Sequence, residues 1–151
     1  MSKATGKYFE DFVPGEEGIS CGRTITEADI VNFAGLTGDW YELHTNKEFA
    51  ANGPFGQRIA HGALIFSIAT GLALRMDPPS EALIAFYGLD RLRFVKPVFI
   101  GDTIHVRQTV LEKTERDAGS GVITVRSEVI NQHEQIAVSY TAKVLYKRRA
   151  A

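Results

Sequence analysis

The chain has 151 residues, of which 44% are hydrophobic and 23% charged, and this is the composition of one ordinary globular domain with a single core. Its net charge of -1 at pH 7 offers no general attraction to nucleic acid or to an anionic membrane, so we expect neither as a partner. Its one cysteine, Cys21, excludes an internal disulfide and a multi-cysteine zinc site. With no apolar signal segment after the first residues, we expect a single cytoplasmic domain over residues 1–151.

The N-terminal part is predicted to hold an anchored segment, a short strand and a capped helix. The aromatic side chains of Tyr8–Gly15 are expected to plug the edge of the core before a turn, and Ile19–Arg23 has the composition of a short strand. Thr26 and Asp29 then have the spacing of a capping box, which predicts that a helix begins there. Gly38 is predicted to end that helix.

Two further helices are predicted before residue 80. A second cap in Thr45–Glu48 predicts a short helix that reaches Ala51. From 63 to 74 the apolar residues occupy every face of a helical wheel, which is typical of a helix surrounded by protein, and Pro78 ends it. Gly71 should cost about 1 kcal/mol relative to alanine inside this helix, so we expect a strand to pack closely against it.

Beyond the prolines the apolar pattern changes to period two, which predicts strands. The short turns between them force antiparallel pairing, because a parallel return needs a crossover of a dozen or more residues. We therefore predict an α+β fold, an antiparallel meander curled round one apolar helix. The basic run at 147–149 is expected to be a solvated end. The predicted strands are 83–94, bent at Gly88, then 103–111, 122–130 and 136–147.

Asp39 and His44 bring a carboxylate and an imidazole onto one stretch, residues 39–44, which we expect to be a loop between two helices. A loop can bring both groups to one water molecule, the arrangement that general acid-base chemistry needs. The alternative is structural: Asp39 would stabilise the loop, and His44 would pack just before the second cap. The spacing alone does not decide between them.

Thr37–His44, followed by Phe55–Gly62, closely resembles the hydratase motif of the MaoC-like dehydratases, the (R)-specific enoyl-CoA hydratase family. Arg23–Asp29 and Phe94–Thr103 also resemble segments of that family, so the likeness covers nearly the whole domain. The resemblance implies the hot-dog fold, a long helix wrapped by an antiparallel sheet. It also implies that the aspartate and histidine of the motif bind and activate the water that adds across the double bond.

The chain departs from the family motif at Tyr41-Glu42, where the family usually has Asn-Pro. Tyr41 has two interpretations: it replaces the asparagine as a hydrogen-bonding group or shapes the acyl pocket, or it only packs. Glu42 would raise the pKa of the aspartate if it faced the site, because like charges repel, and would have no such effect if it pointed to solvent.

His61-Gly62 opens the core helix, where unpaired amides and the helix dipole favour developing negative charge. The resemblance makes the Gly62 N–H the donor to the thioester oxygen, a contribution on the order of 3 kcal/mol. His61 either supports the catalytic pair or caps the helix. The hydroxyls of Ser67 and Thr70 are expected to bond back to their own helix.

The predicted substrate is an acyl-CoA thioester, and Arg91, Arg93 and Lys96 are candidates to bind its phosphates, although surface solubility explains them equally well. The resulting hypothesis is a homodimeric lyase that interconverts a trans-2-enoyl-CoA and an (R)-3-hydroxyacyl-CoA without a metal or other cofactor. The alternatives are a hot-dog thioesterase and a non-catalytic acyl-CoA-binding module. A substrate with a second carboxylate, such as mesaconyl-CoA, stays open.

Overall fold

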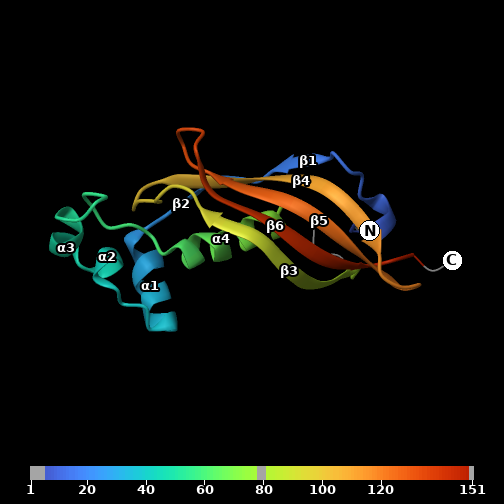
Figure 1. Ribbon diagram of the computed structural model, residues 1–151, viewed down its shortest axis with the longest axis horizontal. Coiled ribbons are helices and arrows are strands. Elements are labelled where there is room, and N and C mark those ends of the chain that lie inside the picture. The colour runs from blue at the N-terminus through green and yellow to red at the C-terminus, as the bar shows by residue number, and fades with distance from the viewer. Residues whose placement is uncertain (1–5, 78–80, 150–151) are drawn as a thin grey trace, which may run out of the picture.

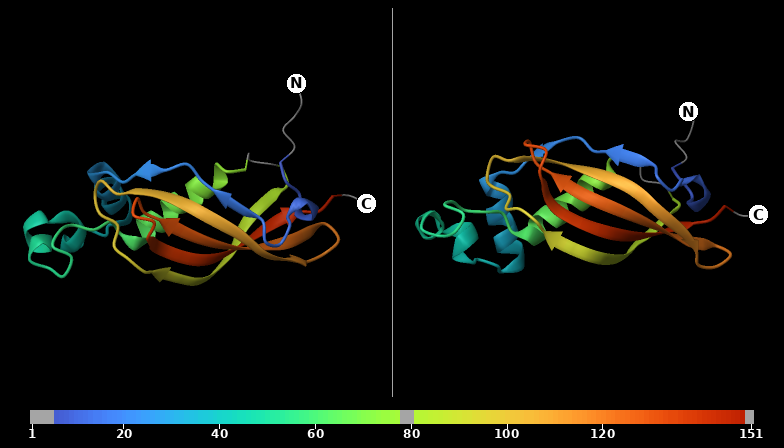
Figure 2. Two further views of the ribbon diagram at one scale, coloured as in Figure 1. Left: turned by 90° about the horizontal axis from the view of Figure 1, so that it is seen from above. Right: turned by 45° about the horizontal axis from the view of Figure 1, so that its top comes forward.

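Six strands form one curled antiparallel sheet, and the helix α4 (Gly62–Leu74) lies along its inner face (Figures 1 and 2). The structure is a computed structural model, and it describes residues 6–77 and 81–149. The strands lie in the order β1-β4-β5-β6-β3, and β2 also pairs with β4. Their bounds are β1 Glu17–Ile19, β2 Arg23–Thr24, β3 Leu83–Phe94, β4 Thr103–Glu115, β5 Ser120–Ile130 and β6 Ile136–Lys147.

Three helices, α1 (Glu27–Thr37), α2 (Glu42–Thr45) and α3 (Lys47–Ala51), gather at one end of the sheet (Figure 1). α1 begins as predicted, because the Thr26 hydroxyl accepts from the Asp29 N–H and the Asp29 carboxylate accepts from the Thr26 N–H. It ends at Gly38, whose φ of 78° is left-handed and favours glycine. Among the described residues no helix is long and apolar enough to cross a membrane.

The predicted meander is confirmed for β4, β5 and β6, which follow one another as antiparallel neighbours. It is wrong for β3, which pairs with β6 at the far edge of the sheet and not with β4. The segment after β3 carries the chain past the start of α4 to the other edge. It is held on the way by the Ala60 N–H, which donates to the Val98 carbonyl at 2.8 Å, and by a bridge between Ile59 and Phe99.

α4 is buried on one side only, which corrects the expectation of a helix surrounded by protein. Leu64, Ile65, Ala69 and Leu72 are buried against the sheet, whereas the opposite flank is exposed. No strand packs against Gly71: the place that a Cβ would take there has no atom within 4 Å beyond the helix's own backbone and the adjacent residues. Gly71 instead lines a cavity of about 530 Å³. The glycine therefore leaves open space where we predicted a close backbone contact.

The N-terminal segment plugs the edge of the core, as predicted. A short 3₁₀ helix, η1 (Phe9–Asp11), places Phe9 in a second apolar cluster with Phe12 and Ile123. The predicted strand Ile19–Arg23 is wrong, because β1 ends at Ile19 and β2 begins at Arg23. Between them the Ser20 hydroxyl takes the place of a backbone acceptor and receives the Val106 N–H at 2.8 Å, which interrupts the ladder.

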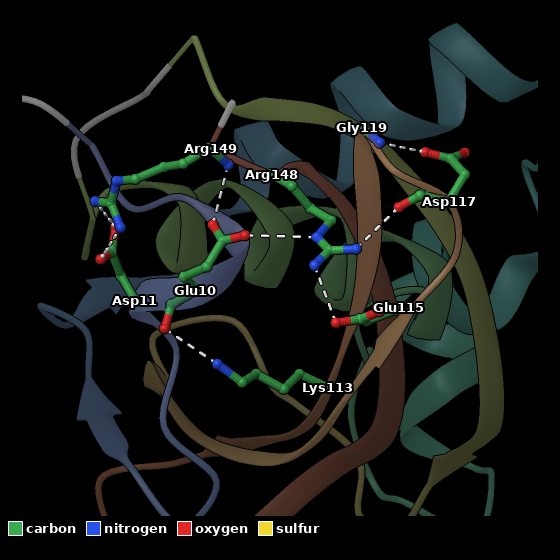
Figure 3. A network of polar contacts seen from close by, with 8 residues as sticks. All are labelled: Glu10, Asp11, Lys113, Glu115, Asp117, Gly119, Arg148 and Arg149. Atoms are coloured by element: carbon green, nitrogen blue, oxygen red, sulfur yellow. Dashed lines mark hydrogen bonds and ion pairs between the residues drawn. The ribbon is translucent and has the colours of Figure 1, made fainter. Parts of the chain in front are cut away.

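The basic tail is held by ion pairs, although we expected it to be solvated (Figure 3). The Arg149 guanidinium donates two hydrogen bonds, of 2.7 and 2.6 Å, to the Asp11 carboxylate. Arg148 reaches Glu115 at 3.0 Å and Glu10 at 3.5 Å. These contacts join η1 to the end of β6. Both described ends of the chain therefore lie at the end of the molecule opposite α1, α2 and α3 (Figures 1 and 2).

Candidate active site

Asp39 and His44 come together among the helices at one end of the sheet. Asp39 lies in the loop after α1, as predicted, whereas His44 lies in the short helix α2 and not in a loop. The Thr45 hydroxyl stabilises this turn by donating to the carbonyl of Trp40 at 3.0 Å, with the Tyr41 carbonyl at 3.2 Å. A helix of four residues is too short to give the apolar period on which the prediction relied.

His44 is oriented by one backbone carbonyl. Its Nδ1 lies 2.7 Å from the carbonyl oxygen of Ile59, and because a carbonyl only accepts, Nδ1 carries the hydrogen. In the neutral ring the lone pair is then on Nε2. Burial lowers the pKa of His44 below its ordinary value, although the bond to the Ile59 carbonyl partly opposes that effect. His44 is therefore neutral at pH 7 and can accept a proton at Nε2.

The Asp39 carboxylate is exposed and lies near His44. Its Oδ1 accepts the Tyr41 N–H at 3.3 Å, and its own N–H donates to the Thr37 hydroxyl at 3.2 Å. One carboxylate oxygen of Asp39 and one ring nitrogen each of His44 and His61 all lie within 4.8 Å of one another. Since hydrogen bonds span about 3 Å, these atoms are close enough for one water molecule to bridge the aspartate and the His44 ring.

His61 is 2% exposed and contacts both members of this pair. Its Nε2 lies 2.9 Å from the backbone carbonyl of Asp39, and its ring stacks on the His44 ring at a centroid distance of 3.8 Å. The Phe33 ring packs against it at 5.0 Å. Although His61 occupies the N-cap position of α4, its side chain makes no capping hydrogen bond. The geometry therefore favours support of the pair over helix capping.

Aspartate and histidine also bind divalent metals, and Asp39, His44 and His61 lie close enough together to be considered as a metal site. A shared cation needs lone pairs that converge on one point, and imidazole lone pairs lie in the ring plane. The two rings are stacked with only 28° between their planes, so their lone pairs lie in two separate, nearly parallel planes. In addition, Nε2 of His61 is already bonded to the Asp39 carbonyl. The arrangement fits a bound water better than a cation held by both imidazoles.

Gly62 is the first residue of α4, so its N–H belongs to the amides that have no carbonyl partner within the helix. A Cβ at this position would lie 2.7 Å from the ring of Phe94, which is closer than any real contact. Any side chain at this position would therefore have to displace the half-exposed Phe94 ring. Sequence reasoning missed Phe94, because nothing in the pattern of β3 indicates which of its aromatic side chains meets α4.

The two residues that depart from the family motif flank the site without entering it. Tyr41 is 57% exposed, and its ring lies edge-on to His44 at 6.1 Å and to Phe49 at 6.1 Å. This contact agrees with the packing interpretation. The Glu42 carboxylate is exposed and accepts a hydrogen bond from the Asn46 side chain at 2.8 Å. It thus matches the alternative in which it points to solvent.

Arg91, Arg93 and Lys96 are exposed at the end of β3 and just after it. Arg91 has a left-handed φ of 53° where the register of β3 shifts against β6 between Asp90 and Arg93. Because Phe94 lies on Gly62, these cations stand at the same end of the sheet as Asp39 and His44. The structure brings none of them into contact with the pair.

The cavity of about 530 Å³ lies along the other half of α4, and none of the candidate catalytic residues lines it. It is bounded by the helix flank at Thr70, Gly71 and Leu74 and by the inner face of the sheet. Apolar side chains dominate its wall, and charged groups contribute to it as well. The charged groups are Lys7, Glu16, Glu17 and Asp77.

The family model for the MaoC-like domain matches residues 13–133. The chain belongs to this family. The chain is 48% identical over 108 residues to the protein MaoC of Klebsiella aerogenes, a match that covers 72% of this chain and 32% of that longer protein. It is 40% identical over 104 residues to an (R)-specific enoyl-CoA hydratase of Rhodospirillum rubrum, covering 68% and 69% of the two chains.

The crystal structure of a MaoC-like dehydratase from Rhodospirillum rubrum superposes with a TM-score of 0.86 at 29% identity, over 97% of this chain and 100% of that one. The fold is the hot-dog fold, as the sequence predicted. The MaoC-like family model includes Asp39, His44, His61 and Gly62 within its matched range.

Proposed function

We propose that this MaoC-like chain is a lyase that adds water to a trans-2-enoyl-CoA to give an (R)-3-hydroxyacyl-CoA, reversibly. The observation that carries the proposal is the His44 ring: its hydrogen bond to the Ile59 carbonyl leaves Nε2 free to accept a proton, and one of its nitrogens lies within 4.8 Å of an Asp39 carboxylate oxygen. Relatives named as hydratases and dehydratases support the reaction class. Adding water is redox-neutral, so the reaction requires no redox cofactor.

In the proposed step a water molecule donates one hydrogen bond to Asp39 and one to Nε2 of His44. The pair removes a proton as the water oxygen bonds to C3 of the substrate, and the π electrons move onto the thioester oxygen to give an enolate. The N–H of Gly62 at the start of α4 donates to that oxygen, a contribution on the order of 3 kcal/mol. The proton taken from water is then delivered to C2, so one water molecule is added in full.

The rival reaction, thioester hydrolysis, requires water at the carbonyl carbon. The Gly62 amide suits an oxyanion in either reaction, so it does not discriminate between them. Asp39 and His44 belong to a separate loop and helix ahead of α4, and from this place we infer that their water attacks C3 and not the carbonyl carbon. The presence of both Asp39 and His44, close to each other, argues against a non-catalytic acyl-CoA-binding module.

For the rest of the substrate, we place the coenzyme A phosphates near Arg91, Arg93 and Lys96, which are exposed at the end of β3 beside Gly62. The acyl tail follows the exposed flank of α4. Ala63, Ser67 and Gly71 are exposed there at intervals of four residues, so their small side chains lie on one face. Gly71 is about 13 Å along the axis from Gly62, and it opens into the cavity.

The reaction class is tested with crotonyl-CoA. We expect the enoyl absorbance to fall while no free thiol appears, with an (R)-3-hydroxy thioester as the product, because the water is held at C3. Release of thiol in step with the loss of absorbance would overturn the hydratase proposal in favour of a thioesterase. Neither signal across several enoyl-CoAs would favour the binding module.

Substitution of the pair tests its catalytic role. Asp39→Asn and His44→Ala are each expected to lower turnover by about two to four orders of magnitude. The double variant should lose little more, because the two groups act on one water. Circular dichroism should show that all three variants stay folded. Wild-type turnover in either single variant would support a purely structural role instead.

The position of the acyl tail predicts a chain-length effect of Gly71→Leu. Leucine would fill the open space at this position, so kcat/KM for 2-dodecenoyl-CoA should fall about tenfold or more, whereas crotonyl-CoA should be converted as before. The free energy of unfolding should rise by about 0.5–1 kcal/mol, because glycine is a poor helix former. Gly71→Ala is the matched control, with the stability gain and little effect on either substrate. Equal losses on both substrates would contradict this placement.

The edge strand β3 predicts a homodimer or a multiple of one. It is 12 residues long, and it exposes Ile84, Phe86 and Tyr87, a surface that soluble proteins usually cover. Light scattering at micromolar concentration should give at least twice the mass of the chain. Ile84→Lys should shift the protein towards monomer, and Leu36→Lys on α1, 84% exposed, should not. A monomeric mass for the wild type would contradict the prediction.

A further inference from the structure

The four residues from Ile59 to Gly62 contact every part of the candidate site. The Ile59 carbonyl fixes the tautomer of His44, and the His61 ring is bonded to the backbone of Asp39. Gly62 supplies the amide at the start of α4. Within this segment, only His61 touches both the aspartate's chain segment and the catalytic histidine through its side chain.

We propose that His61 is a positioning residue. Its Nε2–H holds the Asp39 loop, and its ring packs against the His44 imidazole. Asp39 and His44 are thereby kept at a fixed distance from Gly62. The inference rests on the proposed function, because it assigns to His61 the placement of that function's catalytic pair. It follows from the hydrogen bond of 2.9 Å to the Asp39 carbonyl and the ring stack of 3.8 Å.

The position of the hydrogen on the His61 ring, and the partners of its two nitrogens, distinguish a positioning role from simple packing. A carbonyl only accepts, so Nε2 carries the hydrogen, and in the neutral ring Nδ1 holds a lone pair. Nδ1 is buried and has no hydrogen-bond partner among the described residues. A phenyl ring would fill the same space between Phe33 and His44 without leaving a polar atom unpaired. Packing alone therefore gives no reason for histidine, and the bond from Nε2 to the Asp39 loop does.

The hydrogen bond from Nε2 of His61 ties the Asp39 loop to the residue that precedes Gly62. The Thr37 and Thr45 hydroxyls hold the backbone of this loop locally, but among the described residues its exposed carboxylate receives only the long 3.3 Å bond from the Tyr41 N–H. Without His61 the aspartate and the amide of Gly62 would move independently. A misplacement of about 1 Å between catalytic groups costs on the order of 100-fold in rate.

Two variants separate the hydrogen bond from the ring. His61→Phe keeps a ring against His44 and removes the donor, whereas His61→Gln loses the ring and retains an N–H donor at a similar reach. With crotonyl-CoA, we expect kcat of His61→Phe to fall about 10–100-fold with KM nearly unchanged, because the thioester contacts remain. His61→Gln should recover most of that loss. Arg75→Ala, at the exposed C-cap of α4 and outside the cavity wall, is the control for substitution in this helix and should keep the wild-type kcat.

Three outcomes would overturn the proposal. They are a wild-type kcat in His61→Phe, a loss in His61→Gln as large as in His61→Phe, and an effect confined to KM. Nitrogen NMR of the wild-type protein near pH 7 gives a test that needs neither folding of a variant nor activity. It should show His61 with hydrogen on Nε2 and none on Nδ1, and the opposite tautomer would overturn the proposal. If the wild type had no hydratase activity, the NMR result would still decide how His61 holds the Asp39 loop.

Discussion

The hydrogen bond from Nδ1 of His44 to the carbonyl of Ile59 is the contact on which the candidate site depends. It spans fifteen residues and ties α2 to the segment that leads into α4. That segment is itself fixed to the sheet, because the Ala60 N–H donates to the Val98 carbonyl. The position and tautomer of the imidazole are thus set by backbone groups, which have far less freedom than a pair of side chains on mobile loops.

α4 is buried on one side and exposed on the other, and the two sides have different roles. One side carries the core, with Leu64, Ile65 and Leu72 packed on the sheet. The other side is free of the sheet from Ala63 to Leu74. The first turn of α4 faces Asp39 and His44, and its last turns face the cavity. One rigid helix would therefore set the distance between the reacting end of the proposed substrate and its acyl tail.

Local signals predicted much of the fold. The cap at Thr26, the end of α1 at Gly38 and the four long strands depend on neighbouring residues, and the structure confirms each of them. The partner of β3 is not a local property. It depends on how the chain crosses the start of α4, which the sequence pattern does not encode. The openness at Gly71 was missed for the same reason, since a poor helix former is compatible with close packing or with empty space.

For the candidate site, the sequence indicated the participants but not their arrangement. The resemblance to the family picked out Asp39, His44 and Gly62, and the structure brings the aspartate and histidine together. The parts played by Ile59 and Phe94 were not predicted. A carbonyl has no signature in a sequence, and an aromatic residue in a strand gives no sign that its ring will cover one glycine of a helix.

The ion pairs between η1 and the end of β6 hold the two ends of the described chain together at one end of the molecule. Arg149 donates two hydrogen bonds to the Asp11 carboxylate at the end of the molecule opposite the helices. The two ends of the described chain therefore lie close to each other there (Figures 1 and 3). An affinity tag, a solid support or a fused protein attached to either end would lie at the end of the sheet opposite α1, α2 and α3 (Figure 1). The end of the molecule that holds Asp39 and His44 would still face outward, so anchoring the chain by its ends would leave the proposed site open to the proposed acyl-CoA substrate.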